Sequence, residues 1–141
     1  MIDWRTCATS VVAVAILALG GCAPKVYGLS PTSLTPASTG VVEADVDDNG
    51  NRVLTLEVDH LPEPSELGEG LSTFVVWVRP GSGEQFRNQG GLVIDEDRQG
   101  TLEFKVPYDS MDVKVTAEAD AAALEPGEHV LLEGSVEMDG S

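Results

Sequence analysis

Short runs in which apolar and polar residues alternate are the feature that most restricts how this chain can fold. The clearest run is RVLTLEVDHL, residues 52–61. In an extended chain its apolar residues Leu54, Leu56 and Val58 share one side, and the polar residues between them share the other. This period of two is typical of a half-buried β-strand. The segment therefore predicts a sheet with one face on an apolar core.

Similar short runs recur along the chain, bounded by Gly, Pro, Asn and Asp. The predicted strands are residues 41–46, 52–61, 72–80, 91–94, 101–106, 112–119 and 129–138. Asn49-Gly50 favours a tight turn that pairs the first two strands. The acidic segment that ends at Gly100 is expected to join the fourth and fifth strands in a second hairpin. Residues 72–80 are apolar on both faces, which predicts a central strand.

Frequent turns and the absence of a long helical period predict an all-β fold for residues 41–141. The economical architecture is an antiparallel β-sandwich of immunoglobulin-like type with about seven strands. The Cys-Trp-Cys pattern of true immunoglobulin domains is absent, so the exact topology stays open. Trp77 is expected to anchor the core between two layers, and an aromatic binding platform is the alternative.

The first 21 residues have the features of an export signal. Arg5 supplies a positive charge, and residues 11–19, VVAVAILAL, are continuously apolar. That run is shorter than the roughly 20 residues that cross a bilayer core. Its length and flanks favour a signal peptide over a permanent transmembrane helix.

Leu19, Gly20 and Gly21 precede Cys22, and this stretch resembles the lipobox of bacterial lipoproteins. An ordinary secretory signal is the alternative. The resemblance implies cleavage after residue 21 and acylation of the Cys22 thiol and of its new amine, and several acyl chains hold a protein firmly on a bilayer. In the sorting pattern of Gram-negative lipoproteins, Ala23 in place of aspartate implies transfer to the outer membrane. The expected location is therefore the bacterial cell envelope.

Removal of this signal would leave a mature domain without a free thiol. The chain has two cysteines, of which Cys7 leaves with the signal and Cys22 carries lipid. Residues 22–40 are rich in Pro, Ser, Thr and Gly, which predicts a lipidated cysteine followed by a flexible tether. A tether of this length, on the order of 25 Å, would hold the domain clear of the lipid headgroups.

The strong acidity of the chain limits its partners. The formal net charge is −16 and the sequence pI is about 4.1. Such a chain repels the phosphates of nucleic acids and anionic headgroups, so no nucleic-acid partner is expected. Attraction for divalent cations or basic partners is one interpretation, and a generic solvated acidic surface is the other.

Residues 73–134 also resemble, in the order of their features, the extracytoplasmic domain of anti-sigma-K-type factors. The matching pieces are FVVWVRPGSGE, GGLVIDEDRQGTLEF and DVKVTAEAD, followed by Pro126-Gly127 ahead of VLLEG. The resemblance implies a β-sandwich and a sensing or docking role outside the cytoplasm. Sigma-factor inhibition does not carry over, because the cytoplasmic segment and transmembrane helix of that family have no counterpart in the sequence.

DVDDNG, residues 45–50, is the sharpest candidate for a metal site. Asp45, Asp47 and Asn49 stand at alternate positions before Gly50, as in the first half of a calcium loop. Calcium prefers six to eight oxygen ligands, but Leu56 stands where such a loop places its bidentate glutamate. A hairpin turn with solvated acids explains the same residues. Asp95, Glu96 and Asp97 would add to a cation site only if the fold joined the two turns.

No catalytic site is predicted. The sequence lacks a Gly-x-Ser-x-Gly elbow, a His-Glu-x-x-His pair and a phosphate-binding glycine loop, and His60 and His129 each stand at the end of a predicted strand. We therefore expect a non-catalytic binding or accessory module, anchored to the membrane by lipid, with an envelope protein as its partner and no cofactor. The alternative is an acidic structural or calcium-dependent surface protein.

Overall fold

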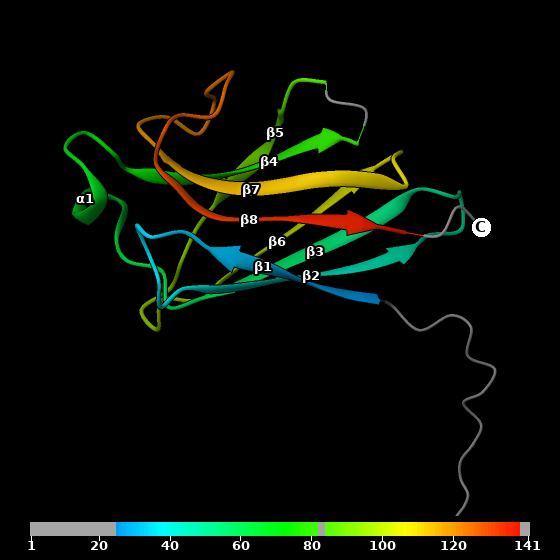
Figure 1. Cartoon of the computed structure of the whole chain (residues 1–141), viewed down its shortest axis with the longest axis horizontal. Coiled ribbons are helices and arrows are strands. Elements are labelled where there is room, and N and C mark those ends of the chain that lie inside the picture. The colour runs from blue at the N-terminus through cyan, green and yellow to red at the C-terminus, as the bar shows by residue number, and fades with distance from the viewer. Residues whose placement is uncertain (1–24, 82–83, 139–141) are drawn as a thin grey trace, which may run out of the picture.

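Eight antiparallel strands and one short helix form the part of the chain that the computed structural model describes, residues 25–81 and 84–138 (Figure 1). The elements are β1 (Lys25–Pro31), β2 (Thr39–Val46), β3 (Arg52–Asp59), α1 (Pro64–Leu67), β4 (Thr73–Pro80), β5 (Arg87–Leu92), β6 (Gly100–Val106), β7 (Ser110–Glu118) and β8 (Val130–Glu137). Neighbouring strands follow the order β5-β4-β7-β8-β1-β2-β3-β6. The prediction of an all-β antiparallel fold is confirmed.

Strand β1 joins the two layers of this sheet. Its first part pairs with β2, from Lys25 opposite Ala44 to Leu29 opposite Gly40, and its last two residues pair with β8. One layer is β1-β2-β3-β6, and the other is β5-β4-β7-β8. Because β1 belongs to both, the sheet curls into a nearly closed barrel, whereas the expected immunoglobulin-like sandwich has two separate sheets.

The barrel stays open along β5 and β6. Ile94 and Gly100 form an isolated bridge at one end of this seam. Otherwise β5 pairs with β4 and β6 pairs with β3. The predicted hairpin between residues 91–94 and 101–106 is therefore wrong beyond this bridge. The connecting turn is present, but each strand has its main partner in a different layer.

The segment predicted as a tether is folded from Lys25 onward, so that prediction and the domain boundary at residue 41 are wrong. Strand β1 packs Leu29 into the core, where the side chain is 7% exposed. The β1–β2 loop that follows is pinned to β8, since Thr32 and Thr35 donate hydroxyl hydrogen bonds to the carbonyls of Val130 and Leu131 at 2.6 and 3.1 Å. In this segment Pro31 ends β1, and the hydroxyl groups of Thr32 and Thr35 fix the loop that follows.

Inward side chains from both layers form one core. The prediction that Leu54, Leu56 and Val58 face inward is confirmed, because all three are buried. Asn49-Gly50 lies in the turn between β2 and β3, which pair along their full length as predicted. This hairpin needs only local information, since the alternation and the turn residues lie within one short segment.

Strand β4 lies between β5 and β7, which confirms the predicted central strand. Its Trp77 is fully buried but faces away from the core that contains Phe74, Val76 and Val78. The Trp77 indole nitrogen donates to Thr116 Oγ1 at 2.8 Å. The prediction that Trp77 packs between two layers is therefore wrong.

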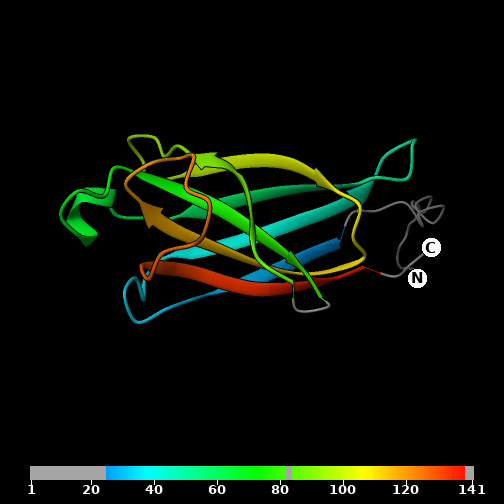
Figure 2. The same cartoon turned by 90° about the horizontal axis from the view of Figure 1, so that it is seen from above.

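The loop between β7 and β8 covers this outer face of β4 (Figure 2). Asn88, opposite Trp77 on β5, donates from its amide nitrogen to the carbonyls of Ala121 and Ala123 at 2.8 and 2.9 Å. On the other side, Glu118 Oε2 accepts the Thr116 hydroxyl at 2.5 Å and the Gly127 amide at 2.8 Å. The indole is buried because these hydrogen bonds hold the loop against the sheet.

Candidate functional site

The two acidic turns have the same internal hydrogen bonds. In the β2–β3 turn, Asp47 Oδ1 accepts the amides of Asn49 and Asn51, both at 2.9 Å. In the β5–β6 turn, Asp95 Oδ1 accepts the amides of Asp97 and Gln99 at 2.9 and 3.0 Å. An aspartate that accepts amides further along the chain stabilises a turn. Both first aspartates thus act as turn-forming residues.

The candidate calcium ligands do not converge on one point. Asp45 Oδ1 accepts the amide of Val46 at 2.8 Å, and Asp47 Oδ2 lies 3.4 Å from Lys105 Nζ. The hydrogen bond from the Asn51 amide is the main cause that lowers the pKa of Asp47 below its ordinary value. Within residues 25–81 and 84–138, no group of three His, Cys, Asp or Glu side chains could hold a metal ion.

The two acidic turns lie at opposite ends of β3. The β2–β3 turn precedes Arg52, whereas the β5–β6 turn leads into Gly100, which pairs with Val58 near the other end of the strand. The joint site that would need Asp95, Glu96 and Asp97 beside Asp47 is therefore absent.

The predicted lipidation residue and cleavage residues lie outside the described part of the chain. These are Cys22 and the preceding Leu19, Gly20 and Gly21. In the described part, no helix has the length and apolar character needed to span a bilayer.

An apolar hollow of about 490 Å³ opens at the end of the barrel opposite the β2–β3 turn. Segments far apart in sequence form it, namely the β1–β2 loop, the chain from His60 to Leu67, and Arg98. Its apolar lining is Leu34, Pro36, Ala37, Leu61, Pro62 and Leu67. Leu61 is 1% exposed and forms part of the core, whereas Leu34 is 41% exposed. We call this feature the loop-end hollow.

Both non-glycine residues with a positive φ in the described chain border this hollow. His60 has a φ of 62° and Arg98 has a φ of 66°. Such angles are uncommon outside glycine and persist where the surrounding structure imposes them. The His60 amide donates to Asp59 Oδ1 at 2.8 Å, and its carbonyl accepts the Ser38 hydroxyl at 3.0 Å. These contacts fix the rim where β3 ends.

Arg98 is held from three directions. Its carbonyl accepts the Leu61 amide at 3.3 Å, and its guanidinium lies 3.4 Å from Glu63 and 3.7 Å from Glu66. The residue therefore ties the β5–β6 turn to the segment that leads into α1. The contacts of Arg98 with Leu61, Glu63 and Glu66 thus connect separate segments of the hollow.

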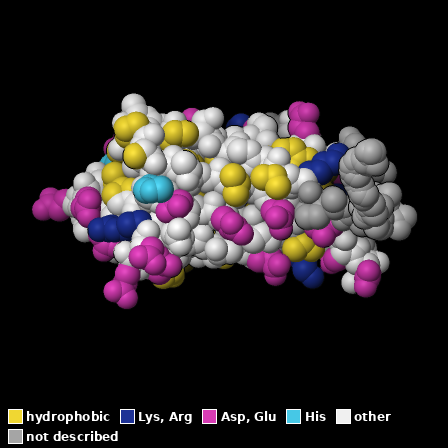
Figure 3. Space-filling view, turned by 90° about the horizontal axis from the view of Figure 1, so that it is seen from below, with side chains coloured by type: hydrophobic (Ala, Val, Ile, Leu, Met, Phe, Trp, Pro, Cys, Tyr) yellow, Lys and Arg dark blue, Asp and Glu magenta, His cyan; other side chains and the backbone are white. Residues whose placement is uncertain are grey.

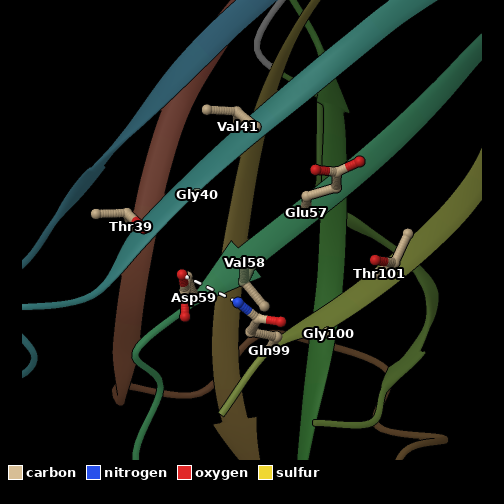
Figure 4. Close-up of a pocket in the computed structure, with 9 residues that line it drawn as sticks. All are labelled: Thr39, Gly40, Val41, Glu57, Val58, Asp59, Gln99, Gly100 and Thr101. Atoms are coloured by element: carbon tan, nitrogen blue, oxygen red, sulfur yellow. Dashed lines mark hydrogen bonds between the residues drawn. The ribbon is translucent and has the colours of Figure 1, made fainter. Parts of the chain in front are cut away.

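A polar groove of about 230 Å³ crosses β2, β3 and β6 on the outer face of the sheet. Its lining includes Thr39, Val41, Glu57, Asp59, Gln99 and Thr101 (Figure 4). Asp59 Oδ2 accepts a hydrogen bond from Gln99 Nε2 at 3.3 Å. In the part of the chain that the structure covers, the side chain of Glu57 has neither a hydrogen bond nor an ion pair. Its carboxylate is available to a cation. We call this feature the sheet groove.

The hollow and the groove adjoin one another, because chain neighbours line the two features at three places. Ser38 lines one and Thr39 the other, and the pairs Asp59–His60 and Arg98–Gln99 divide in the same way. Figure 3 shows carboxylates along this face of the barrel with apolar side chains among them. The combined surface offers an open apolar hollow beside a negatively charged groove. That arrangement suits an apolar side chain next to a basic one, which is the chemistry of a peptide segment.

Comparison of the sequence with protein-family models and curated proteins, and of the structure with solved structures, finds no match. The assignment of a site therefore depends on the geometry of this chain.

Sequence reasoning placed His60 at a strand end, where a histidine is usually a surface or edge residue, but it missed the hollow. The side chain of His60 is 67% exposed, which confirms that expectation. Leu34 was missed because it lies within residues 22–40, which were predicted as a tether. The available signal was a lone leucine between Pro31 and Pro36, in a stretch that is otherwise polar.

Proposed function

We propose that this protein is a bacterial envelope lipoprotein, anchored through Cys22, that binds a partner protein without catalysis. The loop-end hollow takes an apolar side chain of the partner, and the sheet groove takes an adjacent lysine or arginine. The position of these two features side by side carries the proposal. Surfaces that combine a well-formed apolar pocket with a charged margin are common in recognition of peptide segments.

The framework of the site supports a role in docking. The groove lies on paired strands, and the rim of the hollow is fixed by the hydrogen bonds of His60 and Arg98. A rigid binding surface loses little conformational entropy on association. The resemblance of residues 73–134 to the extracytoplasmic domain of anti-sigma-K-type factors, which implies a sensing or docking role outside the cytoplasm, supports the same class of function. Ala23 supports location at the outer membrane.

The calcium-dependent alternative has no specific support in the described residues. Asp47 Oδ1 is occupied by two backbone amides, and Asp45 lies apart with the amide of Val46 as its partner. A general acidic surface would bind cations weakly and without a defined site. The peptide-binding proposal accounts for more of the observed geometry.

Crosslinking pull-down of the lipidated protein from its native membranes tests the proposal. Leu34→Glu places a charge in the hollow and is expected to abolish capture of the partner. Leu124→Glu is the matched control, because Leu124 is an 89% exposed leucine on the β7–β8 loop. Glu57→Gln is expected to weaken capture and reduce its salt dependence. Retention of the same partner by Leu34→Glu and Glu57→Gln would refute this site.

A further inference from the structure

We infer that the β2–β3 turn end of the barrel rests on the lipid bilayer, and that the loop-end hollow faces away from it. This orientation rests on the proposed anchor at Cys22. It follows from how few residues separate that cysteine from the folded barrel.

Only Ala23 and Pro24 separate Cys22 from Lys25, the first residue of β1. An extended chain advances about 3.6 Å per residue, so Lys25 can lie no more than about 11 Å from the acylated cysteine. Lys25 is itself fixed, because it pairs with Ala44 at the edge of the β1–β2 ladder. The anchor therefore holds one particular end of the barrel at the membrane.

Strand register identifies what else lies at this anchored end. Ala44 is close to the β2–β3 turn, Arg52 pairs with Val106 before the β6–β7 turn, and Pro80 pairs with Met111. These turns and the start of β1 share one end of the barrel in Figure 1. The loop-end hollow lies at the other end, beyond the eight residues of β3, which span roughly 25 Å.

The charges of the described residues also differ between the anchored end and the far end of the barrel. The anchored end and the strand residues next to it carry charges of both signs. The cations are Lys25, Arg52, Arg79, Arg87 and Lys105, and the carboxylates are Asp45, Asp47, Asp48, Glu84, Asp109, Asp112 and Glu137. At the far end, Arg98 is the single Lys or Arg that the structure describes. The far carboxylates are Glu63, Glu66 and Glu69 around α1, Asp95, Glu96 and Asp97 in the β5–β6 turn, and Asp120, Glu125 and Glu128 in the β7–β8 loop.

This asymmetry favours the same orientation on an anionic surface. The carboxylates at the anchored end are partly neutralised, since Lys105 contacts Asp47 and Arg52 pairs with Asp109. The acidic far end is repelled by anionic headgroups within about a Debye length, roughly 8–10 Å. Val26 and Val46, which are 62% and 43% exposed at the anchored end, add apolar surface suited to the interface. The short link to Cys22 and the electrostatic repulsion of the acidic far end therefore favour the same orientation.

Fluorescence quenching on vesicles tests the orientation. Full-length protein is lipidated in a bacterial host and carries one engineered thiol for a fluorophore, at Asn49→Cys in the β2–β3 turn or at Leu124→Cys in the β7–β8 loop. The vesicles contain phosphatidylcholine, a minority of phosphatidylglycerol and a lipid with a spin-labelled headgroup. Quenching is expected to be several-fold stronger at position 49 than at position 124. Asp48→Cys, in the same exposed turn, replaces Asn49→Cys if that variant misfolds.

The controls separate the orientation from the anchor. If mass spectrometry finds no acyl group on Cys22, both the anchor and the orientation are wrong. If the acylated protein binds vesicles but the two probes are quenched equally, the anchor stands and the orientation is overturned. A Gly/Ser spacer of about 16 residues between Pro24 and Lys25 extends the reach by roughly 20–24 Å and should remove most of the difference. A difference that survives the spacer unchanged would overturn the linkage argument.

Discussion

Gly50 and Arg98 occupy the same position in two turns that have matching hydrogen bonds. The Gly50 amide donates to the Asp47 carbonyl, and the Arg98 amide donates to the Asp95 carbonyl, both at 3.0 Å. Their φ angles are 84° and 66°. The turn requires a left-handed residue at this position, which glycine adopts readily and arginine does not.

The first prediction is that Arg98→Gly stabilises the protein. Removal of the left-handed strain should raise the free energy of unfolding by roughly 0.5–1 kcal/mol, since exposed ion pairs such as those with Glu63 and Glu66 contribute little. Urea unfolding measures the change, and Gly50→Ala should lower stability by about 1 kcal/mol in the same assay. A loss of stability in Arg98→Gly would show that its contacts outweigh the strain.

The second prediction concerns the seam between β5 and β6. A Cβ at Gly100 would lie 2.7 Å from the Val93 carbonyl oxygen, which is backbone and cannot move aside easily. Gly100→Ala should therefore lower the free energy of unfolding by about 1–3 kcal/mol. Gly28→Ala is the matched control on β1, because nothing lies within 4 Å of its Cβ position. Equal melting temperatures for the two variants would contradict this account of the seam.

The parts of the fold that could be predicted are those with local causes. The β2–β3 hairpin contains its own alternation and its own turn residues, so its pairing followed from a single segment. Strand β1 was missed because Gly28 and Pro31 weaken its pattern, and because its partners β2 and β8 are set by the whole barrel. The outward burial of Trp77 could not be predicted for a similar reason. A strand that is apolar on both faces does not reveal what covers each face.

The candidate site was the least predictable feature. Leu34, His60 and Arg98 belong to three segments that only the curled sheet brings together. The acidic residues were visible in the sequence, but the sequence did not separate turn-forming carboxylates such as Asp47 from that of Glu57, which has no partner among the described residues. That distinction depends on which backbone amides each side chain meets.

The third prediction tests the hydrogen bonds behind Trp77. Thr116 is fully buried, and its hydroxyl accepts from the Trp77 indole and donates to Glu118. Thr116→Val keeps the shape but leaves the buried Trp77 indole N–H without an acceptor and removes one of the two hydrogen bonds to Glu118 Oε2, which should lower the free energy of unfolding by about 1–3 kcal/mol. Thr55→Val, at a half-buried position on the outer face, should change it by less than about 0.5 kcal/mol. Urea unfolding followed by tryptophan fluorescence provides the comparison, and equal effects would exclude the proposed role of Thr116.

The fourth prediction is a pH dependence that originates at Asp112. The Arg79 guanidinium, whose Nη2 lies 2.7 Å from Asp112 Oδ2, is the main cause that lowers the pKa of this carboxyl below its ordinary value. A carboxyl with a lowered folded-state pKa stabilises the fold above its unfolded pKa, and this contribution is lost as the pH falls through the lowered value. Asp112→Asn should therefore lower the melting temperature at pH 6, with a smaller difference from the native protein near pH 3. A difference that stays constant from pH 6 to pH 3 would exclude the ionic contribution.

The fifth prediction separates turn formation from calcium binding at Asp47. Asp47→Ala removes the oxygen that accepts the Asn49 and Asn51 amides, so its melting temperature should fall in buffer with a chelator. Asp47→Asn keeps an oxygen in the same place and should fall less, because it loses only the charge that faces Lys105. Added calcium should leave all three melting temperatures nearly unchanged if the carboxylate serves the turn. A calcium-induced rise in the native protein that both variants lose would instead assign a cation to Asp47, and would favour the calcium-dependent surface protein over the binding module.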